Sequence, residues 1–270
     1  MSAESYQSLW TNYLYNIPFR QGFVKAGGLN TRYVQAGRED APKVLMLHGT
    51  GGTWENWCAN LGPMSQDFDC YAIDMVGAGL TDKPDTDYEI AVYVDHIRAF
   101  LDRMGIERLS MLGLSLGGWI SARFAVTYPE MVDKLVLISS SGLLIDAQNS
   151  SRIQATRMQA VENPTMENMR TVFRNLIKDE SLHMDDLLAL RQIIYSRPDM
   201  KQAMRHIVAI QDPEVRQRNI LYEDEWRSIT APALVIISNA DRDVYVTTSR
   251  KLAELAGKKG EQQQDHRDEE

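Results

Sequence analysis

The chain has 270 residues with an ordinary globular composition, and its formal net charge of −8 gives no basic surface of the kind that binds nucleic acid. Two cysteines, Cys58 and Cys70, support neither a disulfide framework nor a zinc pattern. No stretch is apolar enough for a membrane span or a signal peptide core, so we expect a soluble cytoplasmic protein without a membrane or nucleic-acid partner.

The first half of the chain predicts an α/β architecture. Short strands are expected at residues 23–25 and 31–35, which flank a Gly-Gly turn. Strands and helices then alternate, with strands at 43–47, 70–74, 109–113 and 134–139 and an amphipathic helix at 90–104. Parallel strands joined by right-handed crossovers are the simple solution, and ligands bind at the carboxyl ends of such strands. Residues at or near these ends are His48, Asp74, Ser115 and Ser139.

The pattern G-x-S-x-G lies between the strand at 109–113 and the following helix. Gly113 and Gly117 flank Ser115, and this spacing predicts a sharp strand-to-helix turn that only small neighbours allow. Such a turn exposes the serine hydroxyl above the sheet edge. The N–H of Leu116 would then face a developing negative oxygen. A glycine-rich turn with a bystander serine is the alternative.

The alternation stops at Gly142 and resumes near residue 229. Residues 143–228 contain helix formers and many methionines but no clear strand, which predicts a helical lid. A strand at 233–238 and a helix at 247–255 follow. The last residues, 257–270, are polar and read as a disordered tail. We therefore expect an α/β core (1–142 and 229–256), a lid (143–228) and a tail (257–270).

Four motifs in order make the chain resemble an α/β-hydrolase: the His-Gly loop at 48–52, the D-x-x-G-x-G loop at 74–79, the elbow at 113–117 and an acidic loop at 239–243. Within that superfamily it looks most like hydrolases of aromatic-ring meta-cleavage products, because residues 176–206 are similar to their lid segment. The resemblance implies a mostly parallel sheet flanked by helices, with a helical lid insertion. These enzymes cleave a C–C bond in a 2-hydroxy-6-oxo-dienoate.

The resemblance also implies a catalytic triad in the order serine, acid, histidine. Ser115 is the expected nucleophile and Asp241 the expected acid, with Asp243 as its rival. His266, the one histidine after Asp241, is the expected base, and a catalytic His48 is the alternative.

The residues before His266 are polar, whereas the family has a buried strand there. We therefore expect the last strand and helix of the fold to be absent. The alternative is that His266 lies in a disordered tail and has no catalytic role.

The remaining site residues follow from the same resemblance. The oxyanion hole is expected from the N–H of Leu116 and that of Thr50 or Gly51. Arg191 matches a lid arginine that holds the substrate's carboxylate, although it would equally suit a helix surface, and Trp119 is a second candidate for substrate binding. One departure is Leu114, because these enzymes usually have asparagine there.

The predicted function is that of a serine hydrolase with no metal or organic cofactor, acting on a small, partly apolar ring-cleavage product. A carboxylesterase or lactonase is the first alternative, since Leu114 removes a polar contact. The second is a truncated, inactive hydrolase fold that binds a ligand or a partner chain. The sequence leaves a homo-oligomer open.

Overall fold

The computed structural model describes residues 6–238 and 243–256, with the Asp243 side chain left out. Its described strands form one sheet in the order β1-β2-β4-β3-β5-β6-β7. The strands are β1 (Phe19–Ala26), β2 (Leu29–Ala36), β3 (Lys43–Leu47), β4 (Asp69–Ile73), β5 (Leu109–Leu114), β6 (Val132–Ile138) and β7 (Ala233–Ile236). Strands β1 and β2 pair antiparallel, as do β2 and β4, and every later pair is parallel. The predicted, mostly parallel α/β sheet is confirmed.

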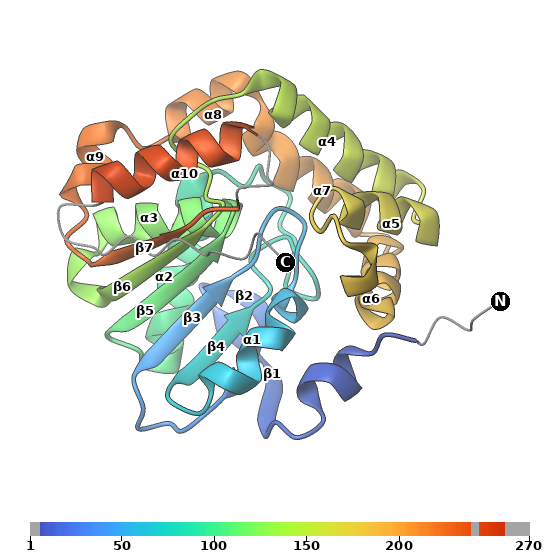
Figure 1. The fold of residues 1–270 in the computed structure, drawn as a ribbon, viewed down its shortest axis with the longest axis horizontal. Helices are drawn as coiled ribbons and strands as arrows, with labels where there is room; N and C mark the ends of the chain where they lie inside the picture. Colours follow the sequence, from blue (N-terminus) through green and yellow to red (C-terminus); the bar gives the residue numbers. More distant parts are fainter. Residues whose placement is uncertain (1–5, 239–242, 257–270) are drawn as a thin grey trace, which may run out of the picture.

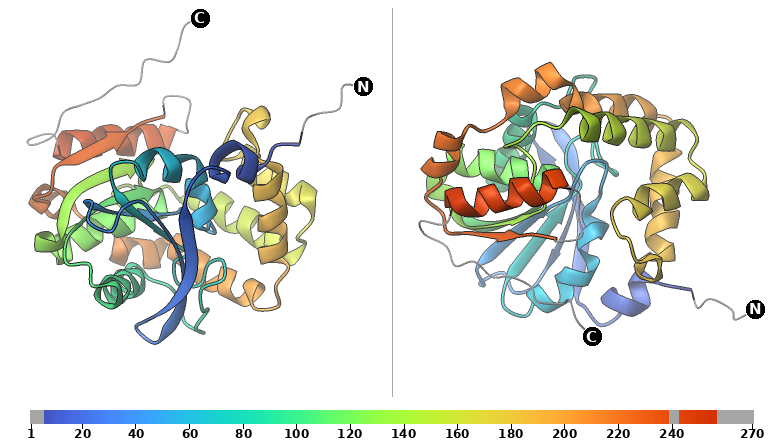
Figure 2. Two further views of the ribbon diagram at one scale, coloured as in Figure 1. Left: turned by 90° about the horizontal axis from the view of Figure 1, so that it is seen from below. Right: turned by 45° about the horizontal axis from the view of Figure 1, so that its top comes forward.

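Helices flank this sheet and a separate helical group lies beside it (Figure 1). The helices around the sheet are α1 (Cys58–Met64), α2 (Ile90–Met104), α3 (Leu116–Thr127) and α10 (Asp243–Ala256). The region predicted as the lid contains α4 (Ala147–Glu162), α5 (Met166–Arg174), α6 (Asp185–Tyr195), α7 (Met200–Val208), α8 (Pro213–Asn219) and α9 (Glu223–Ser228). Figure 2 shows from two further angles that α4 to α7 stand apart from the sheet.

The sheet core is apolar because the central strands are buried on both faces. All five residues of β4 are buried, as are four of the five in β3. Apart from Lys43 and Asp69 at their first positions, both strands are apolar, and such runs are typical of parallel sheets covered by helices. Helix α2 turns one apolar side toward the core and ends at Gly105, whose φ of +68° is the left-handed conformation that closes helices.

The N-terminal segment lies against the lid. The Gln7 N–H donates to the Asp185 carboxylate at 2.7 Å, and the Asp185 N–H donates back to the Gln7 carbonyl at 2.8 Å. Ser8 Oγ also donates to Asp186 at 2.7 Å. These bonds satisfy groups at the start of α6, where the helix leaves its first N–H donors free. The segment before β1 is thus hydrogen-bonded to the start of α6, which lies in the predicted lid.

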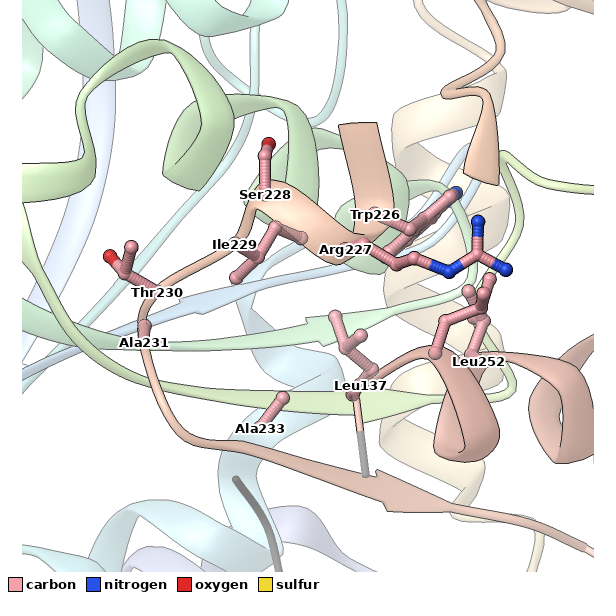
Figure 3. Close-up of a pocket in the computed structure, with 11 residues that line it drawn as sticks. Leu137, Trp226, Arg227, Ser228, Ile229, Thr230, Ala231, Ala233 and Leu252 are labelled. Carbon is pink, nitrogen blue, oxygen red and sulfur yellow. The ribbon is translucent and has the colours of Figure 1, made fainter. Parts of the chain in front are cut away.

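A cavity of about 270 Å³ lies where α9 and α10 meet the sheet edge. Leu137, Trp226, Ala233 and Leu252 are among its lining residues, and Figure 3 shows them around it. Of the residues predicted for the catalytic site, those that the structure describes do not line this cavity. It is therefore a gap in the packing of α10 and not the candidate active site.

Candidate active site

Ser115 occupies a strained turn between β5 and α3. Its φ of 52° and ψ of −109° lie outside the regions that residues with a side chain normally adopt. The turn is held from both sides, because the Ser115 N–H donates to the Ile138 carbonyl at 2.9 Å and its carbonyl accepts from Ser141 at 3.2 Å. The side chain remains partly exposed. The structure therefore has the turn that the G-x-S-x-G pattern predicts.

The glycines around Ser115 are required by close packing. A Cβ on Gly113 would lie 2.4 Å from the Gly117 carbonyl, and a Cβ on Gly117 would lie 2.2 Å from the Leu47 carbonyl oxygen. A Cβ on Gly118 would meet Ser140 Oγ at 2.5 Å. Real Cβ atoms do not approach other atoms so closely, so α3 can start against β3 and β5 only with glycine here.

The loop after β3 runs directly beside the elbow. A Cβ on Gly49 would lie 3.5 Å from Ser115 Cβ, so the backbone of this loop passes the nucleophile. Leu116 is the first residue of α3, where helical N–H groups lack intrahelical acceptors. Thr50 and Gly51 follow Gly49 in the chain. The predicted oxyanion donors thus come from two segments in contact, although the donating groups themselves stay a prediction.

Lid side chains hold the carbonyl groups of that loop. The Thr50 carbonyl accepts from Arg157 Nε at 3.2 Å, and the Gly51 carbonyl accepts from Arg191 Nη1 at 2.5 Å and from the Tyr195 hydroxyl at 3.0 Å. A trans peptide directs its N–H away from its C=O. The lid therefore fixes which way the peptide groups of the predicted oxyanion loop face.

Arg191 is 1% exposed, so the alternative of a surface arginine on a helix is wrong. Its guanidinium carbon lies 5.6 Å from the Phe173 ring centre and 5.5 Å from that of Tyr195. Nη2 reaches Asn56 Oδ1 at 3.3 Å, while Nε is buried and has no hydrogen-bond partner among the described residues. A buried donor left unsatisfied is costly and suggests a ligand that completes it. Its contact with a substrate carboxylate stays a prediction.

Trp119 is fully buried in the first turns of α3. Its indole N–H donates to the Asn219 carbonyl at 3.2 Å, and the Arg216 guanidinium stacks 5.0 Å above its ring. The structure therefore shows Trp119 connecting α3 to α8. Its predicted role in substrate binding remains a prediction.

His48 cannot serve as the base in this arrangement. Its Nε2 accepts the Met75 N–H at 3.1 Å, and its Nδ1 lies 2.8 Å from the Gly49 carbonyl oxygen. Burial, with a smaller contribution from the nearby Arg191 charge, lowers the pKa of His48 to about 4. Both ring nitrogens are thus occupied by the backbone, and His48 shapes the loop beside Ser115.

The other described histidines are also bonded to groups away from Ser115. His96 bridges Thr31 and the Val76 N–H, and His183 contacts the Ile177 carbonyl. His206 lies between two aspartates, Asp85 and Asp87. Within the described part of the chain, no histidine is therefore placed as the partner of Ser115.

The predicted acid and base, Asp241 and His266, lie outside the described residues, as does the tail at 257–270. The side chain of the rival acid, Asp243, is likewise not described. The described chain nevertheless brings the carboxyl end of β7 close to the elbow. Strand β7 ends at Ile236, whose carbonyl accepts the Ser139 N–H at 3.3 Å beside the elbow. An acid in the loop after β7 would start from this edge.

Arg157 and Tyr195 contact the predicted oxyanion loop, and the sequence pattern indicates a role for neither of them. Arg157 lies in α4, whose polar composition predicts an exposed helix with no preferred side. Nothing in the pattern distinguishes it from its neighbour Arg152. Tyr195 precedes a Ser-Arg-Pro sequence that separates α6 from α7. That sequence predicts the end of a helix, but it does not predict that Tyr195 contacts the loop after β3.

Among residues 6–238 and 243–256, no group of three or more His, Cys, Asp or Glu side chains is arranged to hold a metal ion. No helix in these ranges combines the length and apolar character needed to cross a bilayer.

The chain is similar to known hydrolases over most of its length. Residues 42–263 match the family model described as alpha/beta hydrolase fold. The 2-hydroxy-6-oxo-2,4-heptadienoate hydrolase of Pseudomonas putida is 30% identical over 86% of this chain and 83% of its own length. The 2-hydroxy-6-oxo-6-(2'-aminophenyl)hexa-2,4-dienoic acid hydrolase of Metapseudomonas resinovorans is 29% identical over 86% of this chain and 79% of its own.

Among solved structures, the 2-hydroxy-6-oxo-6-phenylhexa-2,4-dienoate hydrolase of Rhodococcus sp. strain RHA1 superimposes with a TM-score of 0.80. That superposition covers 92% of this chain and 90% of the other at 21% identity, and it shows that the two share a fold.

Proposed function

Because this chain belongs to the alpha/beta hydrolase fold family, we propose that it is a serine-dependent hydrolase of ring-cleavage products. The proposed substrate is a 2-hydroxy-6-oxo-dienoate, in which water cleaves the C–C bond next to the ketone. The observation that carries the proposal is the strained turn at Ser115, because it holds a partly exposed hydroxyl beside the loop after β3. The relatives' named substrates support this substrate class.

The proposed chemistry assigns one role to each group. Ser115 attacks the ketone carbon or activates the water that does, and His266, oriented by Asp241, accepts the proton. The N–H of Leu116 and that of Thr50 or Gly51 stabilise the oxyanion. Cleavage gives a carboxylic acid and a shorter 2-hydroxydienoate, and the proton held by the base completes the second product.

Arg191 supports an acidic substrate over a neutral ester. The guanidinium is buried and its Nε has no partner in the part of the chain that the structure describes, so a carboxylate would satisfy it. Leu114, on the other hand, offers no polar contact in the place where these enzymes usually have asparagine. Hydrolysis of an ester or lactone is therefore the competing outcome of the experiment.

The test compares wild type with Ser115→Ala, and uses Ser151→Ala on the exposed side of α4 as the matched control. We expect Ser115→Ala to lower kcat/KM for a 2-hydroxy-6-oxo-dienoate by about 10⁴-fold or more, since the nucleophile is lost. Ser151→Ala should match wild type. Fluorophosphonate labelling followed by mass spectrometry should give an adduct at Ser115 in wild type and in the control.

Three results would contradict parts of the proposal. A kcat/KM that is higher for an activated ester or a lactone than for the dienoate would indicate an esterase. Equal turnover by wild type and His266→Ala would remove His266 from the triad. No adduct at Ser115 together with no turnover would favour an inactive fold that binds a ligand.

A further inference from the structure

Two lid arginines reach the same short loop beside the elbow. Arg157 comes from α4 and donates through Nε to the Thr50 carbonyl at 3.2 Å, while Arg191 comes from α6 and donates to the Gly51 carbonyl at 2.5 Å. Arg157 also packs its Cδ 3.5 Å from the position of a Cβ on Gly51. The two guanidinium groups therefore bond the carbonyls of consecutive residues, and the charge of Arg191 acts on Arg157.

This pair of cations has no counter-charge in the described part of the chain. Neither arginine forms an ion pair there, and Arg157 and Arg191 are 7% and 1% exposed. The charged side chains that most affect Arg157 are Arg191 and Arg152, both positive. Burial, followed by these like charges, lowers the pKa of Arg157. Because a buried charge without a partner is costly, an anion is expected to bind here.

Both arginines keep donors for such an anion. A guanidinium carries five N–H groups. Arg157 uses Nε for its bond to Thr50, and its two terminal nitrogens make no hydrogen bond within the described residues. Arg191 bonds Gly51, Tyr195 and Asn56 through its terminal nitrogens and leaves Nε without a partner. Both side chains therefore keep free N–H donors. A single carboxylate bound to Arg191 would leave the terminal N–H groups of Arg157 without an acceptor.

We propose that Arg157 and Arg191 together form a dianion site, which makes Arg157 a specificity-determining residue. The ligand that fits carries two anionic oxygen groups close to each other, because the two side chains bond the carbonyls of consecutive residues. The second group is either another carboxylate or the enolate oxygen of a 2-hydroxy acid. The assignment of this ligand as a substrate rests on the proposed function, since it requires that Ser115 attack it.

Arg157 has a competing role as a purely structural contact that positions the Thr50–Gly51 peptide. In that case its removal would lower turnover without changing which anions bind. Binding of simple anions therefore separates the two roles, because it needs no catalysis. The three probes are acetate, malonate and glutarate, which present one carboxylate, two carboxylates on one carbon, and two carboxylates three carbons apart.

The experiment measures the Kd of each probe by isothermal titration calorimetry with the full chain. The variants are Arg157→Met, Arg157→Lys and, as the control, Arg205→Met, which removes an exposed arginine of α7. We expect wild type and the control to bind malonate about tenfold more tightly than acetate or glutarate, since two charge-assisted contacts replace one. Arg157→Met should bring malonate to the level of acetate, and Arg157→Lys should retain part of the preference.

Wild type that binds malonate and acetate within about twofold of each other would overturn the proposal, as would an unchanged malonate Kd in Arg157→Met and Arg157→Lys. Should Arg157→Met fail to fold, the lysine variant still decides the question. A protein that binds malonate through Arg157 but hydrolyses no dienoate contradicts the proposed function alone. A protein that hydrolyses the dienoate with no malonate preference contradicts the dianion site alone.

Turnover distinguishes the two sources of the second charge. If it is an enolate oxygen, Arg157→Met should lower kcat/KM alike for a plain 2-hydroxy-6-oxo-dienoate and for one with a second carboxylate at C3. If it is a second carboxylate, only the value for the C3-carboxylated substrate should fall. No fall for either substrate would overturn the role of Arg157 in specificity.

Discussion

At the scale of single residues, Ser115 combines a reactive position with backbone strain. A side chain at φ 52° and ψ −109° costs about 1–3 kcal/mol, and surrounding hydrogen bonds to Ile138 and Ser141 keep it there. Glycine adopts positive φ without this cost. The molecule therefore gives up stability at the one position where the proposed reaction needs a hydroxyl.

This strain predicts an unusual order of stabilities. We expect Ser115→Gly to be more stable than Ser115→Ala by about 1 kcal/mol, because only glycine relieves the strained backbone. On the exposed side of α4, Ser151→Ala should instead be more stable than Ser151→Gly by about 1 kcal/mol, as is usual in helices. Urea denaturation of the four variants measures both differences. A more stable Ser115→Ala would show that the turn carries no strain.

The same residue scale explains how much of the site could be predicted from sequence. The elbow was predictable because the G-x-S-x-G pattern lies within five residues of chain, and Gly113 is forced there by its contact with Gly117. Arg157 was not, because its contact with Thr50 joins positions 107 residues apart. A lone arginine on a polar helix carries no sign that the helix will be folded over a loop of the core.

At the scale of elements, the site depends on how closely α3 approaches β3. The Cα of Gly117 faces the Leu47 carbonyl at a distance that leaves no room for a methyl group. Any residue larger than glycine must move α3 away from the sheet. Since Ser115 and Leu116 begin this helix, such a movement would also displace the proposed nucleophile and oxyanion donor.

Gly117→Ala is therefore expected to destabilise the protein by about 3 kcal/mol, the upper end of overpacking, and to abolish turnover. Gly22→Ala in β1 is the matched control, because its added methyl would meet Tyr33 at an ordinary distance of 3.5 Å. We expect that control to keep wild-type stability and activity. Thermal unfolding and kcat/KM of both variants provide the test, and a normally stable, active Gly117→Ala would refute the close packing.

Element prediction from sequence worked where local signals and tertiary packing agree. The helix predicted at 90–104 has those bounds in the structure, because its apolar periodicity ends at Gly105. The predicted strand at 233–238 is shorter, and β7 ends at Ile236. Before α1 the chain forms a 3₁₀ turn at Trp54–Trp57, where the Trp54 N–H donates to Asp74. That partner comes from another strand end and is not visible in the local pattern.

At the scale of the whole molecule, buried neutral histidines join distant segments and make stability depend on pH. His96 in α2 accepts the Val76 N–H at 3.2 Å on Nδ1 and lies 2.8 Å from Thr31 Oγ1 on Nε2. Burial lowers the pKa of His96 to about 4, as it does for His48. Protonation would remove the acceptor that holds Val76. The folded state therefore requires the neutral form of both rings.

Histidine in an unfolded chain has a pKa of about 6.5. Between that value and about 4, the unfolded chain binds a proton at His96 that the folded chain does not. The free energy of unfolding should therefore fall as the pH falls, by up to about 1.4 kcal/mol per pH unit for each such group. The contribution is fully present above pH 6.5 and is lost progressively toward pH 4.

His96→Asn keeps an oxygen acceptor for the Val76 N–H but cannot titrate. We expect this variant to be less stable than wild type at pH 7, by about 1 kcal/mol for the lost Thr31 contact, yet to lose less stability between pH 6.5 and 4.5. The difference in slope should correspond to about one proton. Burial also raises the pKa values of Asp74 and Glu55, and these groups are present in both proteins and cancel in the comparison.

His206→Asn is the control, because hydrogen bonds to Asp87 and Asp85 raise the pKa of His206 despite partial burial. Its contribution to stability is present below pH 6.5 and is lost as the pH rises, so this variant should not flatten the acid slope. Urea midpoints and m-values measured at half-unit pH steps give the unfolding free energies. Parallel curves for wild type and His96→Asn would mean that His96 gains no proton on unfolding, and the neutral-ring account of acid stability would then fail.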